Sequence, residues 1–345
     1  MKILITGATG FIGSFVAEEA LRQGMEVWAA VRKSSSTAYL GEGRIERIEL
    51  DLSSERQLID SLSGHRFDYV VHCAGVTKCI NSRDFFRVNT EGTKHLVNAL
   101  RATRQPLKRF VYLSSLSVYG PVREKMPYTA IRTDDIPCPN TAYGRSKLAA
   151  EAFLDSLLTL SPKASGNGDR AEEPFPFVVL RPTGVYGPRE KDYFMMASSI
   201  KKHLDLSVGF RPQDLTFIYV SDVVQAVFLA LERGRTGGKY FLSDGGVYSS
   251  RTFSDLLRRE LGNPWLLRLR VPLWILRAIA GIGELAGRAT GKATALNNDK
   301  YHIMKQRNWR CDIEPARREL GFHPSVMLDE GVKRSVEWYR KEGWL

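Results

Sequence analysis

The sequence predicts an α/β protein in which a doubly wound parallel sheet is joined to a smaller, mostly helical C-terminal domain. Short apolar segments alternate with amphipathic helical segments through the first two thirds of the 345 residues. Such alternation is typical of parallel strands joined by helical crossovers, and right-handed crossovers place helices on both faces of the sheet. Beyond residue 181 the strand pattern weakens, and most segments have the periodicity of helices.

Seven segments are predicted as strands, because each is short, apolar and rich in β-branched or aromatic residues. They cover residues 3–6, 26–31, 45–50, 69–72, 110–113, 177–180 and 239–242. Apolar residues at helical spacing predict helices at 11–23, 82–103, 221–232, 250–261, 272–289, 313–320 and 328–341. The polar stretch 161–176 is predicted as a surface loop.

The composition is that of an ordinary soluble protein, with 43% hydrophobic and 26% charged residues. Basic residues exceed acidic ones by 50 − 38 = 12, which favours anionic partners. They are spread along the whole chain without a dense block, so nucleic-acid binding is not expected. Scattered cysteines, with no His or Cys at ligand spacing, predict a reduced, cytoplasmic protein without a metal. No uncharged segment reaches the roughly 18 residues that a membrane-spanning helix needs.

A glycine-rich turn, GATGFIG, lies between the first predicted strand and the first predicted helix. One glycine permits the tight turn, one lets a pyrophosphate approach the backbone, and one lets the helix pack on the sheet. The N-terminus of the helix then faces the anion. The turn predicts a dinucleotide site in a Rossmann domain, with contacts from Gly7, Thr9, Gly10, Phe11, Ile12 and Gly13.

The end of the second predicted strand indicates which dinucleotide binds. NAD sites place a carboxylate there for the ribose 2′-hydroxyl, whereas this chain has Arg32 and Lys33. Because a guanidinium can bind a 2′-phosphate with two hydrogen bonds, NADP is favoured and NAD is the alternative. After the third strand, Asp51 and Leu52 are predicted to flank the adenine, although Asp51 could instead cap the helix that follows.

Three side chains form a candidate catalytic set. Tyr143 and Lys147 are four residues apart, which places them on one face of a helix. An adjacent ammonium favours the phenolate, so we expect Lys147 to lower the pKa of Tyr143 from its ordinary value of about 10. Ser115 follows the fifth predicted strand, at the edge where such sheets bind ligands. Its hydroxyl can hydrogen-bond an oxygen whose charge changes during hydride transfer.

Six motifs together resemble the extended short-chain dehydrogenase/reductase family, also called the NAD-dependent epimerase/dehydratase family. They are TGATGFIG, HCAGVT, VNTEGT, LSSLSVYG, YGRSK and LRPTGVYGPRE. The resemblance implies that Ser115 is the catalytic serine, that Tyr143 is the general acid/base, and that Lys147 holds the nicotinamide ribose. It also implies further cofactor contacts and a homodimer formed through a four-helix interface. The contacts are Cys73, Ala74, Gly75, Asn89, Tyr143, Lys147, Pro182, Gly184 and Val185.

We expect a Rossmann domain of residues 1–180 plus 217–245 and a substrate-binding domain of residues 181–216 plus 246–345. The sugar-nucleotide 4,6-dehydratases of the family carry an Asp-Glu pair where this chain has Leu116 and Ser117. Without that acid and base, dehydration is not expected. Sugar-nucleotide epimerases usually have an asparagine at the position of Gly184. The surrounding motif looks more like the 3β-hydroxysteroid dehydrogenase and dihydroflavonol reductase branch.

These comparisons favour an NADP-preferring oxidoreductase for a lipophilic secondary alcohol or ketone. The alternatives are a nucleotide-sugar 4-epimerase with tightly bound NAD and, with less support, a binding module that has lost catalysis. The apolar helical segment 271–287 agrees with a lipophilic substrate, because it could wall a pocket or lie on an anionic membrane. An ordinary core helix is the simpler interpretation.

Overall fold

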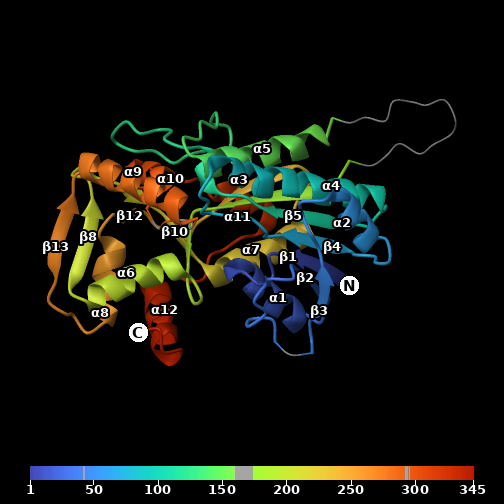
Figure 1. The fold of residues 1–345 in the computed structure, drawn as a ribbon, viewed down its shortest axis with the longest axis horizontal. Helices are drawn as coiled ribbons and strands as arrows, with labels where there is room; N and C mark the ends of the chain where they lie inside the picture. Colours follow the sequence, from blue (N-terminus) through green and yellow to red (C-terminus); the bar gives the residue numbers. More distant parts are fainter. Residues whose placement is uncertain (42, 160–173, 292–293, 295) are drawn as a thin grey trace.

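A seven-stranded parallel sheet forms the centre of the molecule (Figure 1). The computed structural model describes residues 1–41, 43–159, 174–291, 294 and 296–345, so most of the predicted loop 161–176 lies outside the described residues. The strand order is β11-β6-β5-β4-β1-β2-β3, which is the doubly wound Rossmann arrangement. The strands are β1 (Lys2–Thr6), β2 (Glu26–Val31), β3 (Glu46–Glu49), β4 (Tyr69–His72), β5 (Arg109–Leu113), β6 (Phe177–Pro182) and β11 (Gly238–Leu242).

Helices cover both faces of this sheet, which explains why its strands are apolar on both sides. One face carries α1 (Phe11–Arg22), α7 (Val220–Arg233) and α11 (Glu314–Leu320). The other carries α2 (Glu55–Leu62), α4 (Gly92–Ala102) and α5 (Ala142–Ser156).

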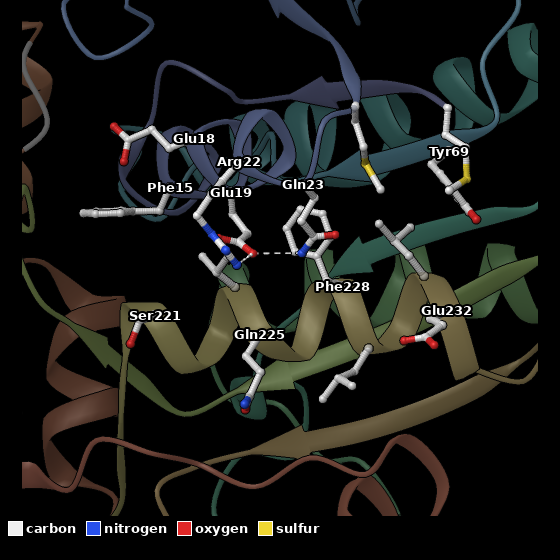
Figure 2. Close-up of a pocket in the computed structure, with 15 residues that line it drawn as sticks. Phe15, Glu18, Glu19, Arg22, Gln23, Tyr69, Ser221, Gln225, Phe228 and Glu232 are labelled. Atoms are coloured by element: carbon white, nitrogen blue, oxygen red, sulfur yellow. Dashed lines mark hydrogen bonds and ion pairs between the residues drawn. The ribbon is translucent and has the colours of Figure 1, made fainter.

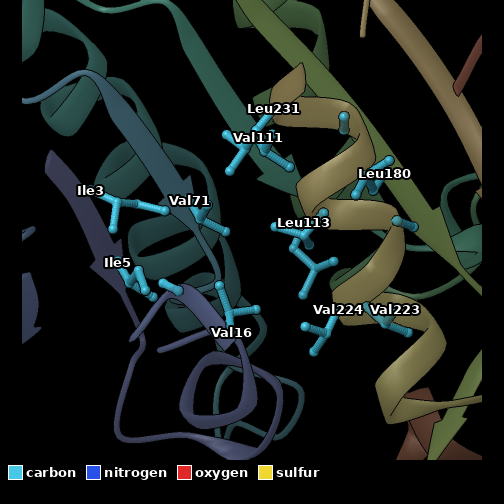
Figure 3. Close-up of a cluster of buried hydrophobic side chains, with 14 of the residues drawn as sticks. Ile3, Ile5, Val16, Val71, Val111, Leu113, Leu180, Val223, Val224 and Leu231 are labelled. Atoms are coloured by element: carbon cyan, nitrogen blue, oxygen red, sulfur yellow. The ribbon is translucent and has the colours of Figure 1, made fainter. Parts of the chain in front are cut away.

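Figure 3 shows the first of these two cores, where side chains of α7 point towards the sheet. Val223 and Val224 lie against a row that includes Leu113 and Leu180. On β1, Ile3 and Ile5 face this core, whereas Leu4 between them belongs to the core on the other side. This alternation follows from the two-residue period of a strand.

All seven predicted strands are present, and their ends differ from the predicted ones by at most two residues. The predicted helix 82–103 is less regular than expected. It is divided into α3 (Ser82–Phe85), a π-helical segment (Phe86–Glu91) and α4. Segments of π-helix occur mostly at functional sites, and this one contains Asn89, which lies beside the candidate site.

The C-terminal part of the chain forms a smaller lobe. Its helices are α6 (Lys191–Lys201), α8 (Thr252–Glu260), α9 (Leu273–Thr290), α10 (Asn298–Lys305) and α12 (Leu328–Lys341). Of these helices, α6 and α10 were not predicted, and the lobe also contains strand pairs that were not predicted. These pairs are β7 (Gly184–Tyr186) with β10 (Phe217–Tyr219), β9 (Asp214–Leu215) with β12 (Tyr248–Ser249), and β8 (Leu204–Val208) with β13 (Leu267–Val271). The exact division between the two domains stays a prediction.

None of the helices within the described residues is both long enough and apolar enough to cross a membrane.

A buried ion pair fixes α5 on the sheet. Arg181 of β6 donates from Nη2 to Glu151 Oε2 at 2.5 Å and from Nε to Oε1 at 3.1 Å. The two side chains are 3% and 0% exposed. Ser114 Oγ also donates to Glu151 at 2.5 Å, and Arg181 Nη1 donates to Tyr119 Oη at 3.1 Å. Burial opposes the charge of Arg181, but the Glu151 carboxylate raises its pKa overall. The residues around the end of β5 are therefore tied to α5 and β6 through one carboxylate.

Replacing Arg181 by leucine should lower the free energy of unfolding by about 3–5 kcal/mol, because the Glu151 carboxylate would stay buried without its partner. Urea denaturation followed by circular dichroism measures the loss. As a control, Arg22→Leu removes an exposed ion pair with Glu19 and should change the stability far less. Equal losses in the two variants would contradict this account of the buried pair.

Candidate active site

The main candidate site is a cavity of about 690 Å³ at the carboxyl ends of the central strands, between the sheet and the smaller lobe. Ligands bind at this edge in open α/β sheets. The sheet side is lined by the glycine turn and by the predicted catalytic residues Ser115, Tyr143 and Lys147. The lobe side is lined by residues of α6 and α10. The structure therefore brings the two predicted sets of residues together around one space.

The glycine turn forms a close-fitting cradle at the start of α1. Gly7 has a positive φ of 69°, and a Cβ placed there would lie 2.7 Å from Ala74 N. A Cβ on Gly13 would lie 2.2 Å from Gly7 O. No side chain caps the N-terminus of α1, so its first N–H groups are available to an anion. Of the predicted contacts in this turn, Gly7, Gly10, Phe11, Ile12 and Gly13 line the cavity, but Thr9 does not.

The three predicted catalytic residues lie on two neighbouring elements. Ser115 follows β5, and its Oγ accepts a hydrogen bond from Ser117 N at 3.1 Å. Tyr143 and Lys147 lie on α5, which begins where Thr141 Oγ1 accepts from Gly144 N at 2.9 Å. Lys147 Nζ donates to Leu113 O at 2.8 Å. The set is therefore held by the end of β5 and the first two turns of α5.

The pKa of Tyr143 is shifted in the direction opposite to the predicted one. Burial raises the pKa of Tyr143, and a hydrogen bond with Ser115 opposes this rise. The predicted lowering by Lys147 is wrong, because the Lys147 ammonium is engaged by Leu113 O and lies 4.8 Å from the centre of the Tyr112 ring. Burial lowers the pKa of Lys147 to about 8, which leaves the ammonium the main form at pH 7. The phenol accordingly keeps its proton at neutral pH.

Asn89 joins two segments of the chain beside the site. It is fully buried, and its Oδ1 accepts from Val76 N at 2.8 Å while its Nδ2 donates to Val76 O at 3.1 Å and to Ser146 Oγ at 3.0 Å. These bonds hold the segment after β4 against α5. Asn89 does not line the cavity; its hydrogen bonds give it a positioning role, and its contact with the cofactor stays a prediction.

The other predicted cofactor contacts lie at the ends of β4 and β6 or just after them. Cys73, Gly75, Pro182, Gly184 and Val185 line the cavity, and Ala74 lies against Gly7 instead. Burial raises the pKa of the Cys73 thiol to about 12, so the thiol is neutral at physiological pH.

The predicted adenine-side residues lie apart from this cavity. Arg32 and Lys33 are exposed after β2, and Lys33 Nζ is 3.8 Å from Glu49. Asp51 is exposed after β3, where it accepts from Ser53 N at 2.9 Å. The alternative that Asp51 caps α2 is wrong, because Ser54 is the N-cap and accepts from Gln57 N. Arg32 is close enough to Asp51 to contribute to lowering its pKa, although the hydrogen bonds from Ser53 contribute more.

The smaller lobe contributes residues that sequence reasoning missed. Asp299 of α10 accepts from Ala142 N and Tyr143 N, each at 3.0 Å, at the N-terminus of α5. Asp192 of α6 pairs with Lys78 and with Lys300, whose Nζ is 3.0 Å away. No motif marks these residues, because they come from separate segments that meet only in the folded chain.

Tyr193 of α6 fills the space beside Gly184. A Cβ on Gly184 would lie 2.5 Å from Tyr193 Oη and 3.3 Å from Phe217 Cδ1. The Tyr193 ring stacks on Phe253, with 4.7 Å between ring centres. The space that an asparagine side chain at position 184 would need is thus filled by aromatic rings.

Figure 2 shows a separate hollow of about 850 Å³ between α1 and α7. It is lined by Phe15, Tyr69 and Phe228 among others, and it includes no residue of the glycine turn or the catalytic set. Arg22 at its rim is paired with Glu19 (Figure 2). This hollow therefore lies apart from the candidate active site. Within the part of the chain that the structure describes, no group of three or more His, Cys, Asp or Glu residues is arranged to hold a metal ion.

Replacing Asp299 by alanine should loosen the N-terminus of α5, because two backbone N–H groups would lose their acceptor. Loss of such a cap costs about 1 kcal/mol, so amide exchange at Ala142 and Tyr143 should accelerate about fivefold. Hydrogen exchange measured by mass spectrometry on peptides around residue 143 tests this. Asn298→Ala, which changes the exposed neighbouring residue, is the matched control. The same exchange rates in both variants would contradict the cap.

Comparison with known proteins agrees with this architecture. Sterol demethylase protein B of Methylococcus capsulatus is 27% identical, and the match covers the whole of both chains. UDP-glucose 4-epimerase of Vibrio cholerae is 26% identical over 97% of this chain and 94% of its own. The crystal structure of a Thermotoga maritima UDP-glucose 4-epimerase has the same fold, with a TM-score of 0.78, 23% identity and 99% of each chain covered.

The model of the NAD dependent epimerase/dehydratase family matches residues 3–243. This match includes every strand of the central sheet, the glycine turn and the three predicted catalytic residues. The chain belongs to the NAD-dependent epimerase/dehydratase family.

Proposed function

We propose that this chain is an NADP(H)-preferring oxidoreductase that interconverts a lipophilic ketone and the corresponding secondary alcohol. One observation carries the proposal: Ser115, Tyr143 and Lys147 meet the glycine cradle around a cavity whose opposite wall contains Tyr193 and apolar side chains. The family match supports a nicotinamide enzyme but leaves the substrate open, since relatives of similar identity have different names and activities.

The residues present fit a dinucleotide. Gly7 and Gly13 leave room that a Cβ would fill, and the uncapped N-terminus of α1 suits a pyrophosphate. Lys147 would hold the nicotinamide ribose, and Arg32 would bind a 2′-phosphate. When bound, the nicotinamide donates or accepts the hydride.

The protein's own residues handle the proton and the substrate oxygen. Because burial keeps Tyr143 protonated at neutral pH, its phenol is suited to donate a proton to an oxygen on which negative charge develops. Ser115 lines the same cavity as Tyr143, so its hydroxyl would offer a second hydrogen bond to the same oxygen. The arrangement therefore favours reduction of a ketone over oxidation of an alcohol at neutral pH.

The substrate side of the cavity supports a lipophilic compound. Beyond the catalytic set its lining includes Met195, Met196, Ile303 and Met304. Methionine side chains adapt to irregular apolar ligands. Leu116 and Ser117, the two residues after the catalytic serine, offer no acid–base pair for the elimination of water.

A nucleotide-sugar 4-epimerase is the second candidate, and one observation favours it. Two ammonium groups, Lys78 and Lys300, share the single carboxylate of Asp192 at the cavity. Burial alone would raise the pKa of Asp192, but these two ammonium groups lower it overall. These three side chains carry one net positive charge, which would suit a diphosphate, although the nearby Glu190 carboxylate, which also lines the cavity and interacts with Lys300, opposes it. The aromatic filling beside Gly184 argues for the first candidate.

Replacing Tyr143 by phenylalanine should lower kcat for ketone reduction by about 10²- to 10⁴-fold, the usual contribution of a general acid. Cofactor affinity, measured by quenching of protein fluorescence, should be nearly unchanged. In the wild type the reduction rate should hold steady through neutral pH, because the raised pKa of Tyr143 keeps its proton in place. Activity retained in the variant would remove Tyr143 from the reaction.

The nucleotide released from denatured protein distinguishes the two candidates. We expect an empty site or substoichiometric NADP(H), identified by mass spectrometry, because a reductase must exchange its cofactor at every turnover. Arg32→Ala should weaken NADPH about tenfold while leaving NADH unchanged, since only NADPH carries the 2′-phosphate. Lys33→Ala, which removes a neighbouring exposed charge, should have a smaller effect. Near-stoichiometric NAD would instead establish the epimerase.

A further inference from the structure

The outer face of α9 is apolar although it faces solvent. At about 100° per residue, Trp274, Ala278, Ile279, Ile282 and Leu285 fall within one arc of the helix. The exposed fractions of the large side chains are 73% for Trp274, 47% for Ile279, and 67% for both Ile282 and Leu285. A surface helix normally carries polar residues on this side.

The inner face of the same helix already has its own packing partners. Leu276 and Ala280 are buried against Tyr301 and Met304 of α10 and against Val271 of β13. The simpler interpretation, an ordinary core helix, accounts for this inner face only. The outer arc lacks a covering element within the described residues.

The strand pair beside α9 extends the apolar surface. β13 leads directly into α9 through Pro272, and both elements lie at one end of the molecule with β8 (Figure 1). Val208 and Val271 pack under the α9–α10 pair, whereas Leu206, Leu267 and Leu269 on the same face of the strands are 51%, 53% and 44% exposed. The bare part of this face therefore continues the apolar arc of the helix.

Aromatic and basic side chains border this surface. Trp265 is 68% exposed just before β13, and Phe210 is 65% exposed in the loop that contacts α9 through Gly209. Arg277 of α9 is exposed at the edge of the arc and forms no ion pair with the other residues that the structure describes, and Arg270 is exposed on the opposite face of β13. Tryptophan prefers the boundary between water and lipid, and free arginines attract anionic headgroups.

We propose that the outer arc of α9 and the bare face of β8 and β13 form a peripheral anchor on anionic phospholipid bilayers. Three features fit this occupant together: an uncharged apolar arc, exposed aromatic side chains at its start and on the adjoining strands, and an exposed arginine, Arg277, at its border. The excess of basic residues, 50 against 38 acidic ones, also favours binding to an anionic surface. The anchor lies on the surface and does not span the bilayer.

The anchor lies next to the candidate active site. α10, which packs against α9, contributes Asp299, Ile303 and Met304 to the cavity lining. Docking through α9 would bring the lobe side of the cavity close to the bilayer, where a lipophilic ketone is concentrated. This consequence rests on the proposed function, but the anchor itself does not.

Flotation of the full chain with phosphatidylcholine vesicles, with and without phosphatidylglycerol, tests the anchor without substrate or cofactor. The wild type should float with the anionic vesicles, and added salt should weaken this binding. The double variant Ile282→Ser/Leu285→Ser should partition at least about tenfold less, because two side chains that enter the lipid are lost. Arg270→Gln/Arg277→Gln should reduce the preference for anionic vesicles.

Ile136→Ser is the matched control, since Ile136 is 84% exposed and lies outside the proposed surface. It should bind vesicles as the wild type does. Thermal unfolding of each variant should match the wild type, because the replaced side chains face solvent. Three results would overturn the proposal: no vesicle binding by the wild type, unchanged binding by the serine double variant, or a wild-type dimer that this variant converts to a monomer in light scattering. The dimer result would assign the surface to a second copy of the chain.

Discussion

The buried contact between Glu151 and Arg181 is the constraint on which the geometry of the site depends. A carboxylate and a guanidinium that are both removed from water are stable only if each has its hydrogen-bonding partners. Here Ser114 and Tyr119, on the segment that also carries Ser115, provide the additional bonds. The same pair therefore fixes the helix that carries Tyr143 and the segment that carries Ser115. Any movement of α5 along the sheet would leave a buried charge without its partner.

The second fixed point lies at the other end of α5 and comes from the smaller lobe. Asp299 accepts hydrogen bonds from the first backbone N–H groups of the helix, so α10 and α5 are joined next to Tyr143. Asp192, with Lys78 and Lys300, makes another link between the lobe and the segment after β4. These polar bridges join the two parts of the chain at the cavity, whose lining combines their charged groups with the apolar side chains of Met195, Met196 and Ile303.

The wall opposite the candidate catalytic residues carries the feature on which the proposed substrate class rests. Tyr193 and Phe217 occupy the space beside Gly184, so a polar side chain there would have to displace an aromatic ring. The candidate catalytic residues do not indicate the substrate, because donating a proton to an oxygen and orienting that oxygen require the same groups for a ketone of any size. The proposed choice of substrate therefore rests on the lobe, which contributes Met195, Met196 and Ile303 to the cavity together with Asp192 and Lys300.

Much of the fold could be predicted from sequence because its signals are local. The strands of the central sheet are continuous apolar runs covered on both faces, and the glycine turn needs its glycines for steric reasons within a few residues. Ser115, Tyr143 and Lys147 were also predicted, since their spacing and motifs indicate them directly. The short strand pairs of the lobe were not, because they are only two to five residues long and their partners are distant in sequence, as for β8 and β13, which pair across about sixty residues.

Other features were decided only by the tertiary structure. The pKa of Tyr143 depends on burial, which sequence spacing does not report, and burial reverses the direction expected from Lys147 alone. The role of Asn89 in holding the chain after β4 against α5 is visible only in the folded chain, since Val76 and Ser146 come from separate segments. Asp299 and Tyr193 act at the site only because distant segments meet there. The sequence by itself determined the sheet, the glycine cradle and the candidate catalytic set, because each is specified by residues close together along the chain. The tertiary structure decided the protonation of Tyr143, the hydrogen bonds that hold α5 in place and the residues that line the cavity, because these depend on residues that are close in space but distant in sequence.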